Sequence, residues 1–261
     1  MHQFNLIGKV AIVTGGYGHL GSAMVRALLS ANAQVVVAGR SKEKYEQKFT
    51  PDELLRLEFM PIDITSEESI GTFFEDVKAK FGRVDILVNN AHTARGNSQE
   101  AMPDSDWAYT MDGVVGSVHR CVKAVIPIMK KQQSGKIINI TSMYGLVSPD
   151  FGMYKGDDCE KYTNPPHYGA AKAAMNQLTR YFAVLLGPYG ICVNSISPGP
   201  FPKPEIQAAN PKFVERLSRK NPLNRIGNPD DLAGVTLLLS SSASDFITGQ
   251  VIQVDGGWTI W

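Results

Sequence analysis

The sequence predicts one α/β domain built on a doubly wound, parallel sheet of seven strands with helices on both faces. Seven short apolar runs alternate with segments of helix length, which is the pattern of parallel strands joined by crossover helices. The runs are continuously apolar rather than alternating, as expected for strands buried on both faces. Because the chain has 261 residues and 43% of them are hydrophobic, residues 1–261 fit a single domain with a large core.

The apolar runs follow one another in a regular order. The first, KVAIVTG at 9–15, leads through a glycine-rich turn into an expected helix over Ser22–Ala31. The second, AQVVVAGR at 33–40, precedes an expected helix over Lys42–Phe49. The other runs are LEFMPID at 57–63, RVDILVNN at 83–90, GKIINITS at 135–142, GICVNSISPG at 190–199 and GQVIQVDGG at 249–257. Their lengths are typical of strands in compact domains.

The composition argues against several classes of partner. A net charge of +1 predicts no attraction to nucleic acid or to an anionic membrane, and no apolar run is long enough to cross a bilayer. The first residues, MHQFNLIGKV, lack the basic and apolar regions of a signal peptide, so we expect a cytoplasmic protein that acts on a small molecule. Cys121, Cys159 and Cys192 are widely spaced and the five histidines are scattered, so we expect neither a disulfide framework nor a metal site.

The glycine-rich turn after the first run predicts a dinucleotide site. Gly16, Gly18 and Gly21 form the pattern G-x-G-x-x-G between a strand and a helix. Glycines at these positions allow a tight turn, a close approach of the backbone to a pyrophosphate, and close packing of the helix on the strand. The helix N-terminus would then face the phosphates with free N–H groups. The residues predicted to bind the cofactor here are Gly15, Gly16, Tyr17, Gly18, His19, Leu20 and Gly21.

The end of the second run predicts which nicotinamide cofactor is bound. An acid there would bind the ribose 2′-hydroxyl of NAD, but the chain has Gly39 followed by Arg40. An arginine can hold a 2′-phosphate through two parallel hydrogen bonds, so NADP(H) is predicted in preference to NAD(H). Alternatively, Arg40 could cap the next helix from the surface. The neighbouring loop and the later strand ends add Ser41, Asp63, Ile64, Asn90 and Ala91 to the predicted cofactor contacts.

A catalytic tyrosine needs a fixed positive charge nearby, because an ordinary pKa of about 10 makes tyrosine a poor acid or base at neutral pH. The stretch YKGDDCEKYTNPPHYGAAK holds three tyrosines, and on a helix the residue four positions ahead lies on the same face. Tyr154 has an acid and Tyr162 a proline at that distance. Only Tyr168 has a lysine, Lys172. This spacing taken alone would also fit a solvated helix face.

Several motifs in register resemble the short-chain dehydrogenase/reductase family over nearly the whole chain. They are Thr14-Gly15 with its turn, Asn89-Asn90-Ala91, Ser142 after IINIT, Tyr168-x-x-x-Lys172, NSISPG at 194–199 and ITGQVIQVDGG at 247–257. The resemblance implies a single Rossmann domain, a nicotinamide cofactor and a homotetramer or homodimer.

The same resemblance implies roles for a catalytic trio, Ser142, Tyr168 and Lys172. Tyr168 would exchange a proton with the substrate oxygen, and Ser142 would hydrogen-bond that oxygen and stabilise its developing charge. Lys172 would lower the pKa of the tyrosine and hold the nicotinamide ribose, so Tyr168 and Lys172 are predicted to contact the cofactor as well. The remaining predicted cofactor contacts, beside the nicotinamide, are Pro198, Gly199 and Phe201.

Three single residues depart from the family pattern. His19 stands at the middle glycine of the common turn, and His92 stands at the last glycine of NNAG. Gly113 stands at the family's catalytic asparagine, which helps to hold a water that relays protons. A glycine is expected to leave room for a water there and to expose its carbonyl. Asp112 or main-chain carbonyls are the expected substitutes, and we predict an active enzyme with an altered relay.

The segment between Ser142 and Tyr168 is longer than is usual in the family, and the excess falls in residues 149–167. Its proline, glycine, aspartate and asparagine content predicts a loop that borders the active site. Met143, Tyr144 and Tyr154 are predicted to contact the substrate, and residues 200–222 to form a flap over it. The loop could instead face solvent without touching the substrate. Similar loops in members that resemble flagellin-modification oxidoreductases and gluconate 5-dehydrogenases point to a sugar-derived substrate.

Three functions compete for this sequence. The leading prediction is an NAD(P)(H)-dependent oxidoreductase that interconverts a secondary alcohol and a ketone on a polar, sugar-like molecule. The second is a 3-oxoacyl-[acyl-carrier-protein] reductase, although Lys130 and Lys131 alone make no clear basic patch for an acidic carrier. The third is a non-catalytic dinucleotide-binding protein, which Gly113 favours and the intact catalytic trio argues against.

Overall fold

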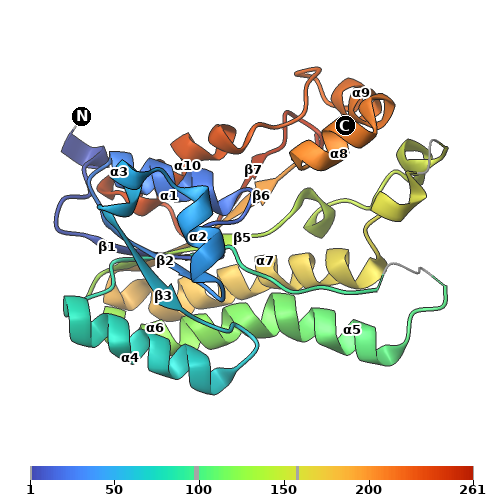
Figure 1. Cartoon of the computed structure of the whole chain (residues 1–261). Coiled ribbons are helices and arrows are strands. Elements are labelled where there is room, and N and C mark those ends of the chain that lie inside the picture. The colour runs from blue at the N-terminus through green and yellow to red at the C-terminus, as the bar shows by residue number, and fades with distance from the viewer. Residues whose placement is uncertain (1, 97–99, 157–158, 261) are drawn as a thin grey trace.

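One parallel sheet of seven strands forms the centre of the described chain, residues 2–96, 100–156 and 159–260 of the computed structural model (Figure 1). The strands are β1 (Val10–Thr14), β2 (Gln34–Gly39), β3 (Leu57–Pro61), β4 (Ile86–Asn89), β5 (Gly135–Ile140), β6 (Ile191–Pro198) and β7 (Val251–Val254). Their order across the sheet is β3-β2-β1-β4-β5-β6-β7, which confirms the predicted doubly wound fold. The order reverses between β1 and β4, and open α/β sheets bind ligands beside the carboxyl ends of such strands.

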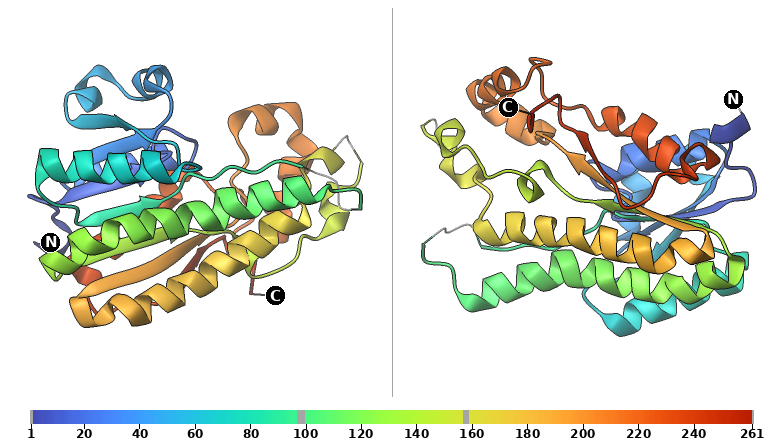
Figure 2. Two further views of the ribbon diagram at one scale, coloured as in Figure 1. Left: turned by 90° about the horizontal axis from the view of Figure 1, so that it is seen from below. Right: turned by 180° about the vertical axis from the view of Figure 1, so that it is seen from behind.

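Helices cover both faces of the sheet (Figure 2). They are α1 (Gly21–Ser30), α2 (Lys42–Lys48), α3 (Pro51–Leu54), α4 (Glu67–Phe81), α5 (Asp104–Met111), α6 (Ser117–Gln132), α7 (Pro166–Leu186), α8 (Pro204–Ala209), α9 (Pro211–Lys220) and α10 (Ala233–Ser240). One layer holds α4, α6 and α7, and the other holds α1 against α10. Phe73 and Phe74 are buried under the first layer, and Met24 and Leu28 under the second. The apolar strands therefore have a core on each side, as their sequence predicts.

Helices α5 and α6 run on from one another through a π-helical turn, η2 (Asp112–Gly116) (Figure 2). A π-turn is a rare local widening of a helix and often lies at a functional site. This turn packs against α7 and contains Gly113, the residue that stands at the family's asparagine. The carbonyl of Gly113 accepts a hydrogen bond from the backbone N–H of Thr93, just beyond β4, at 3.3 Å.

The prediction of a loop over residues 149–167 is wrong for its last two residues, and it misses two short helices inside the segment. Helix α7 already begins at Pro166, because proline is well suited to the first position of a helix, where its missing N–H has no partner to lose. His167 therefore belongs to the helix and is buried. Two short 3₁₀ helices, Phe151–Tyr154 and Glu160–Tyr162, lie inside the segment. Residues 157–158 of the predicted loop lie outside the described part of the chain.

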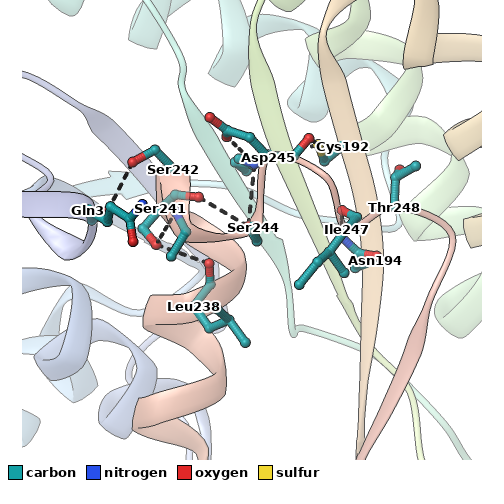
Figure 3. A network of polar contacts seen from close by, with 12 residues as sticks. Gln3, Cys192, Asn194, Leu238, Ser241, Ser242, Ser244, Asp245, Ile247 and Thr248 are labelled. Carbon is teal, nitrogen blue, oxygen red and sulfur yellow. Dashed lines mark hydrogen bonds and ion pairs between the residues drawn. The ribbon is translucent and has the colours of Figure 1, made fainter.

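A polar network holds the last strands together near the amino-terminal half of β6 (Figure 3). Asn194 on β6 donates a hydrogen bond to the carbonyl of Ile247 at 2.8 Å, and its side-chain oxygen accepts one from the N–H of Gln250 at 3.0 Å. Ser242 donates to the carbonyl of Gln3 at 3.2 Å, which ties the N-terminal segment to the end of α10. The functional site lies at the opposite, carboxyl ends of the strands.

Candidate active site

A cavity of about 450 Å³ lies along the carboxyl ends of the strands, and residues from most of the segments predicted to form the site line it. The predicted residues that line it are Gly15, Tyr17, Gly18, His19, Leu20, Arg40, Asp63, Ile64, Asn90, Ala91, Ser142, Tyr168, Lys172, Pro198, Gly199 and Phe201. The cavity is also lined by His92 and Thr93, which were not predicted as site residues, and by Lys203 from the predicted flap. The fold thus brings the glycine turn, Arg40 and the catalytic trio to one cavity.

Two of the predicted glycines serve close packing and do not line the cavity. A Cβ atom on Gly16 would lie 2.9 Å from a methyl carbon of Val25 and 3.0 Å from the carbonyl oxygen of Val13. A Cβ on Gly21 would lie 2.9 Å from the side-chain nitrogen of Asn90. Both contacts are too short for a side chain, so these glycines let α1 approach β1 and the end of β4.

The turn between β1 and α1 fits the phosphates of a dinucleotide. Gly15 has a φ of +61°, a conformation that favours glycine, and lines the cavity. Leu20 gives the first turn of α1 no side-chain cap. The Ser22 N–H is bonded to the Gly18 carbonyl at 3.1 Å, so the other N–H groups of this turn are the candidates to meet an anion. His19 places a buried Nε2 here that has no hydrogen-bond partner among the described residues. Burial, followed by the charges of Lys48 and Lys203, lowers the pKa of His19.

Hydrogen bonds between Thr14 and Asn90 hold the turn against the end of β4. The Thr14 hydroxyl oxygen accepts bonds from the N–H groups of Asn90 and Ala91, both at 3.0 Å. The Asn90 side chain donates to the carbonyls of Thr14 and Gly15, at 2.9 and 3.0 Å. The two segments that would enclose a nicotinamide dinucleotide are therefore positioned relative to one another before any ligand binds.

Tyr17 occupies the position where an NAD-type acid would lie. A Cβ atom built on Gly39 would overlap the Tyr17 ring. The Tyr17 hydroxyl accepts hydrogen bonds from the backbone N–H groups of Arg40 and Ser41, at 3.0 and 3.1 Å. Ser41 caps α2 with its side chain, which excludes the alternative that Arg40 is the cap, and Ser41 does not line the cavity. The exposed Arg40 side chain lines the cavity instead.

The catalytic trio lies at the nicotinamide end of the cavity. Lys172 is 2% exposed, and its Nζ lies 5.7 Å from the centre of the Tyr168 ring and donates a hydrogen bond to the carbonyl of Ile140 at 2.8 Å. Burial lowers the pKa of Lys172 to about 7. Burial also raises the pKa of Tyr168, while a hydrogen bond with Ser142 acts in the opposite direction. The net shift of the Tyr168 pKa is upward, because desolvation outweighs the hydrogen bond with Ser142, and the lowering of this pKa by Lys172 stays a prediction.

His92 and Thr93 are site residues that sequence reasoning missed. The ring centre of His92 lies 6.0 Å from that of Tyr168. Part of the His92 side chain is open to solvent through the cavity. Partial desolvation of the imidazole by the surrounding protein, followed by the charge of Lys172, lowers the pKa of His92 to about 4. The imidazole is therefore neutral near pH 7. The signal that could have found both residues is their place directly after Asn90-Ala91, beyond the end of β4.

Asp112, an expected substitute for the family's asparagine, is engaged elsewhere. Its two carboxylate oxygens accept hydrogen bonds from Arg120 at 2.7 and 3.0 Å, and this pairing lowers the pKa of Asp112. The space beside Gly113 is filled by Thr93, so the expected room for a water at the glycine itself is absent. This expectation was wrong because a glycine in a packed protein leaves space only if no neighbouring segment moves into it.

The predicted substrate contacts pack with one another instead of lining the cavity. Met143, Tyr144 and Tyr154 are 5–6% exposed and belong to a cluster with Phe213 and Trp258. The hydroxyls of Tyr144 and Tyr154 are hydrogen-bonded to each other. The reason is that the lengthened loop folds back onto α9, which buries its aromatic side chains. Contact of these three residues with a substrate remains a prediction.

The chain is similar to known proteins in sequence and in fold. The family described as enoyl-(acyl carrier protein) reductase matches residues 18–259. The rhamnolipids biosynthesis 3-oxoacyl-[acyl-carrier-protein] reductase of Pseudomonas aeruginosa is 32% identical, with 99% of each chain covered. The cyclohexanol dehydrogenase of Rhodococcus sp. (strain TK6) is 32% identical, with 97% of each covered. A gluconate 5-dehydrogenase from Burkholderia cenocepacia J2315, solved in complex with NADP and tartrate, has a TM-score of 0.87 at 30% identity, covering 99% of this chain and 98% of that one.

The chain belongs to the short-chain dehydrogenase/reductase family. This confirms the resemblance carried by the motifs. As a short-chain dehydrogenase/reductase, the protein is a dinucleotide-binding oxidoreductase that interconverts an alcohol and a ketone. None of the helices in the described residues is long and apolar enough to span a membrane. In the same part of the chain, no group of three or more His, Cys, Asp and Glu side chains is arranged to hold a metal ion.

Proposed function

We propose that this short-chain dehydrogenase/reductase is an NADP(H)-preferring enzyme that interconverts a secondary alcohol and a ketone on a small, polar, sugar-like molecule. The observation that supports this most strongly is the convergence of the glycine turn, Arg40 and the catalytic trio on one cavity. Each came from a different segment of the sequence. A retired site would have no reason to keep all of them together.

The nicotinamide, when bound, would supply or accept the hydride at the carbinol carbon. Ser142 would hydrogen-bond the substrate oxygen and hold it beside Tyr168. In the direction of reduction, Tyr168 would give its phenolic proton to that oxygen, and burial keeps the tyrosine protonated at neutral pH. Lys172, with a pKa of about 7, would be close to half protonated there and would stabilise the phenolate that remains. In the direction of oxidation the same groups would act in reverse.

Three features support the preference for NADP(H). Arg40 lines the cavity with an exposed side chain that could pair with a 2′-phosphate. Position 39 has no acid, and the Tyr17 ring takes the space in which one would lie. The similar gluconate 5-dehydrogenase was solved with NADP.

The turn residues would hold the pyrophosphate, with His19 and the first N–H groups of α1 as donors.

Arg40→Ala tests this preference directly, and Arg180→Ala, on the exposed face of α7, is its control. Binding of NADPH and NADH is followed by fluorescence titration. We expect Arg40→Ala to weaken NADPH by about tenfold or more, as for loss of a charge-assisted hydrogen bond, and to leave NADH nearly unchanged. Tighter binding of NADH than of NADPH to the natural protein would refute the proposal.

The substrate class is argued from the polar end of the cavity. Besides the trio, His92 and Lys203 supply an imidazole and an ammonium group there. Such groups suit a hydroxylated molecule that carries a carboxylate, and the similar Burkholderia cenocepacia enzyme is a gluconate 5-dehydrogenase. A panel of keto-sugars, polyols, aldonates and acetoacetyl thioesters, followed by NADPH absorbance, tests the choice.

The second candidate is a 3-oxoacyl-[acyl-carrier-protein] reductase, because the Pseudomonas aeruginosa relative bears that name. It takes the lead if acetoacetyl thioesters outrank every sugar-derived compound in kcat/KM. If no compound is turned over while NADPH still binds, the non-catalytic reading takes the lead.

We further propose that the chain forms one domain and acts in the cytoplasm as a homotetramer or homodimer. One sheet with a core on each face supports the single domain. Tyr181, Val184 and Leu185 on α7 are 59%, 81% and 43% exposed, and such an apolar face supports a subunit interface. Residues 149–167 would form the specificity loop and residues 200–222 the flap. Light scattering of the purified protein tests the oligomeric state.

A further inference from the structure

His92 lies directly beyond the end of β4, and its exposed side chain lines the same cavity as Tyr168 and Lys172. The centres of the His92 and Tyr168 rings are 6.0 Å apart, which is within the range of aromatic rings in contact. The proton transfer at Tyr168 makes no use of the imidazole. A polar ring thus stands beside the reacting position without a part in the reaction itself.

The neighbours of His92 decide which of its ring nitrogens can bind a ligand. One ring nitrogen donates a hydrogen bond to the backbone carbonyl of Asn90, the one hydrogen-bond partner of this ring among the described residues. Partial desolvation, followed by the charge of Lys172, outweighs that bond and lowers the pKa of His92 to about 4. The imidazole is therefore neutral near pH 7, and its second nitrogen carries a lone pair and no hydrogen. It can accept a hydrogen bond from a ligand.

The backbone that follows His92 is held in place by hydrogen bonds within the protein. The Thr93 N–H donates to the carbonyl of Gly113 at 3.3 Å. The Arg95 carbonyl accepts a hydrogen bond from the Nε2 of His167 at 2.7 Å. His167 is fully buried and directly precedes the proposed proton donor on α7. The imidazole and the proton donor are thus fixed relative to one another, which reduces the entropy that a substrate must lose on binding both.

This arrangement suits a substrate with two neighbouring oxygens. Its reacting oxygen would meet Ser142 and Tyr168, and a hydroxyl on the next carbon would donate to the free nitrogen of His92. A substrate with a methylene at that carbon would leave the nitrogen without a partner in a partly desolvated cavity, which is unfavourable.

We infer that His92 is a specificity-determining residue, which selects ketones and alcohols that carry a hydroxyl on the carbon beside the reacting one. This inference rests on the proposed function and narrows its sugar-like substrate to compounds with two oxygens on adjacent carbons. The hydrogen bond at His92 binds the substrate, and the proton transfer stays with Tyr168.

Two ketones that differ by one hydroxyl, 2-hydroxycyclohexanone and cyclohexanone, test the inference with saturating NADPH. The natural protein should have a kcat/KM about tenfold higher for the hydroxyketone, as for one net hydrogen bond. His92→Phe keeps a ring but removes the acceptor, so the preference should disappear through loss of activity on the hydroxyketone. His92→Gln should keep a preference, because its amide oxygen accepts hydrogen bonds.

His119→Phe is the matched control, because His119 is exposed on α6 and does not line the cavity. It should behave like the natural protein. An unchanged preference in His92→Phe would refute the inference, and equal losses on both ketones would show a structural role and refute it too. Weaker NADPH binding as the sole effect of His92→Phe would make the residue a cofactor contact instead.

A binding measurement separates this inference from the proposed reaction. Alcohols cannot be oxidised by the complex with NADPH, because its cofactor is already reduced. Calorimetric titration of that complex should show about tenfold tighter binding of 1,2-cyclohexanediol than of cyclohexanol, and His92→Phe should abolish the difference. A natural protein that binds the diol no better than cyclohexanol would overturn the inference. Turnover of neither ketone would refute the proposed reaction, while the titration still decides the role of His92.

Discussion

The phenol ring of Tyr17 lies against Gly39, and its hydroxyl accepts hydrogen bonds from the N–H groups of Arg40 and Ser41. One side chain from the turn after β1 therefore supports the loop after β2 and fills the space beside its glycine. A side chain at position 39 would have to displace this ring. The two positions are coupled, and a change of cofactor preference must treat them together.

We expect Gly39→Asp alone to weaken both NADPH and NADH, because the new carboxylate pushes Tyr17 from its two hydrogen bonds. Tyr17→Ser combined with Gly39→Asp should shift preference toward NADH, since the acid then has room to meet a ribose hydroxyl. Fluorescence titration of both cofactors measures the effect, with Arg40 unchanged throughout. Tighter NADH binding by Gly39→Asp alone would show that the ring is no obstacle.

Tyr168→Phe should remove most turnover, by about 10²–10⁴-fold in kcat, because the proton donor is lost. NADPH affinity should change little. The matched control is Tyr154→Phe, which loses the hydrogen bonds of the Tyr154 hydroxyl with Tyr144 and Asn164 and should cost about 1–2 kcal/mol of stability with turnover retained. Steady-state kinetics and thermal melting separate the two results. An inactive Tyr154→Phe beside an active Tyr168→Phe would place the chemistry elsewhere.

The buried Lys172 should make the stability of the cofactor-free protein depend on pH. Its pKa falls from 10.5 to about 7 on folding, so between these values the unfolded chain binds more protons than the folded one. Stability is therefore fully present above about pH 10.5 and is lost as pH falls toward 7, by at most about 1.4 kcal/mol per pH unit. Tyr168 acts with the opposite sign, but only above about pH 10, because its pKa is raised.

Denaturant unfolding of the natural protein and of Lys172→Met at several pH values isolates this effect. The natural protein should gain stability relative to the variant from about pH 7 to pH 10, and the difference should level off below about pH 7. A difference that does not vary with pH would mean that the lysine keeps an ordinary pKa.

The lengthened loop and the flap should act on the substrate as a unit. The Asn210 side chain donates a hydrogen bond to the Tyr162 hydroxyl at 2.7 Å, and the Tyr162 ring stacks on Phe213 of α9 at 5.5 Å. Tyr162→Phe keeps the ring but frees the flap, so we expect KM for the substrate to rise about two- to tenfold, as for loss of a net hydrogen bond of up to about 1.4 kcal/mol. NADPH affinity should stay constant. Tyr189→Phe, at a half-buried tyrosine just after α7, is the control, and an unchanged KM in Tyr162→Phe would favour a loop without substrate contact.

The sequence by itself determined the parallel sheet, the family and the place of the candidate site. Continuous apolar runs identify strands buried on both faces, and such strands must carry their ligand groups at the carboxyl ends. The turn that holds Gly16 and Gly21 could be predicted because the end of a strand, a tight turn and the start of a helix depend on residues that are neighbours in the sequence. The pairing of Tyr168 with Lys172 could be predicted from their spacing, because residues three to four apart lie on the same face of a helix.

Only the tertiary structure decided how residues from separate segments share one space. Thr93 fills the volume beside Gly113, Tyr17 covers Gly39, and the lengthened loop buries Tyr154 against α9. Each of these contacts joins segments that no local pattern relates, and close packing leaves each volume to one side chain. The pKa of Lys172 belongs to the same class, because it depends on how completely the folded chain removes water from the ammonium group. A sequence pattern specifies which groups reach the carboxyl edge of the sheet, but packing decides how deeply each is buried, how far its pKa shifts and whether a side chain has room there.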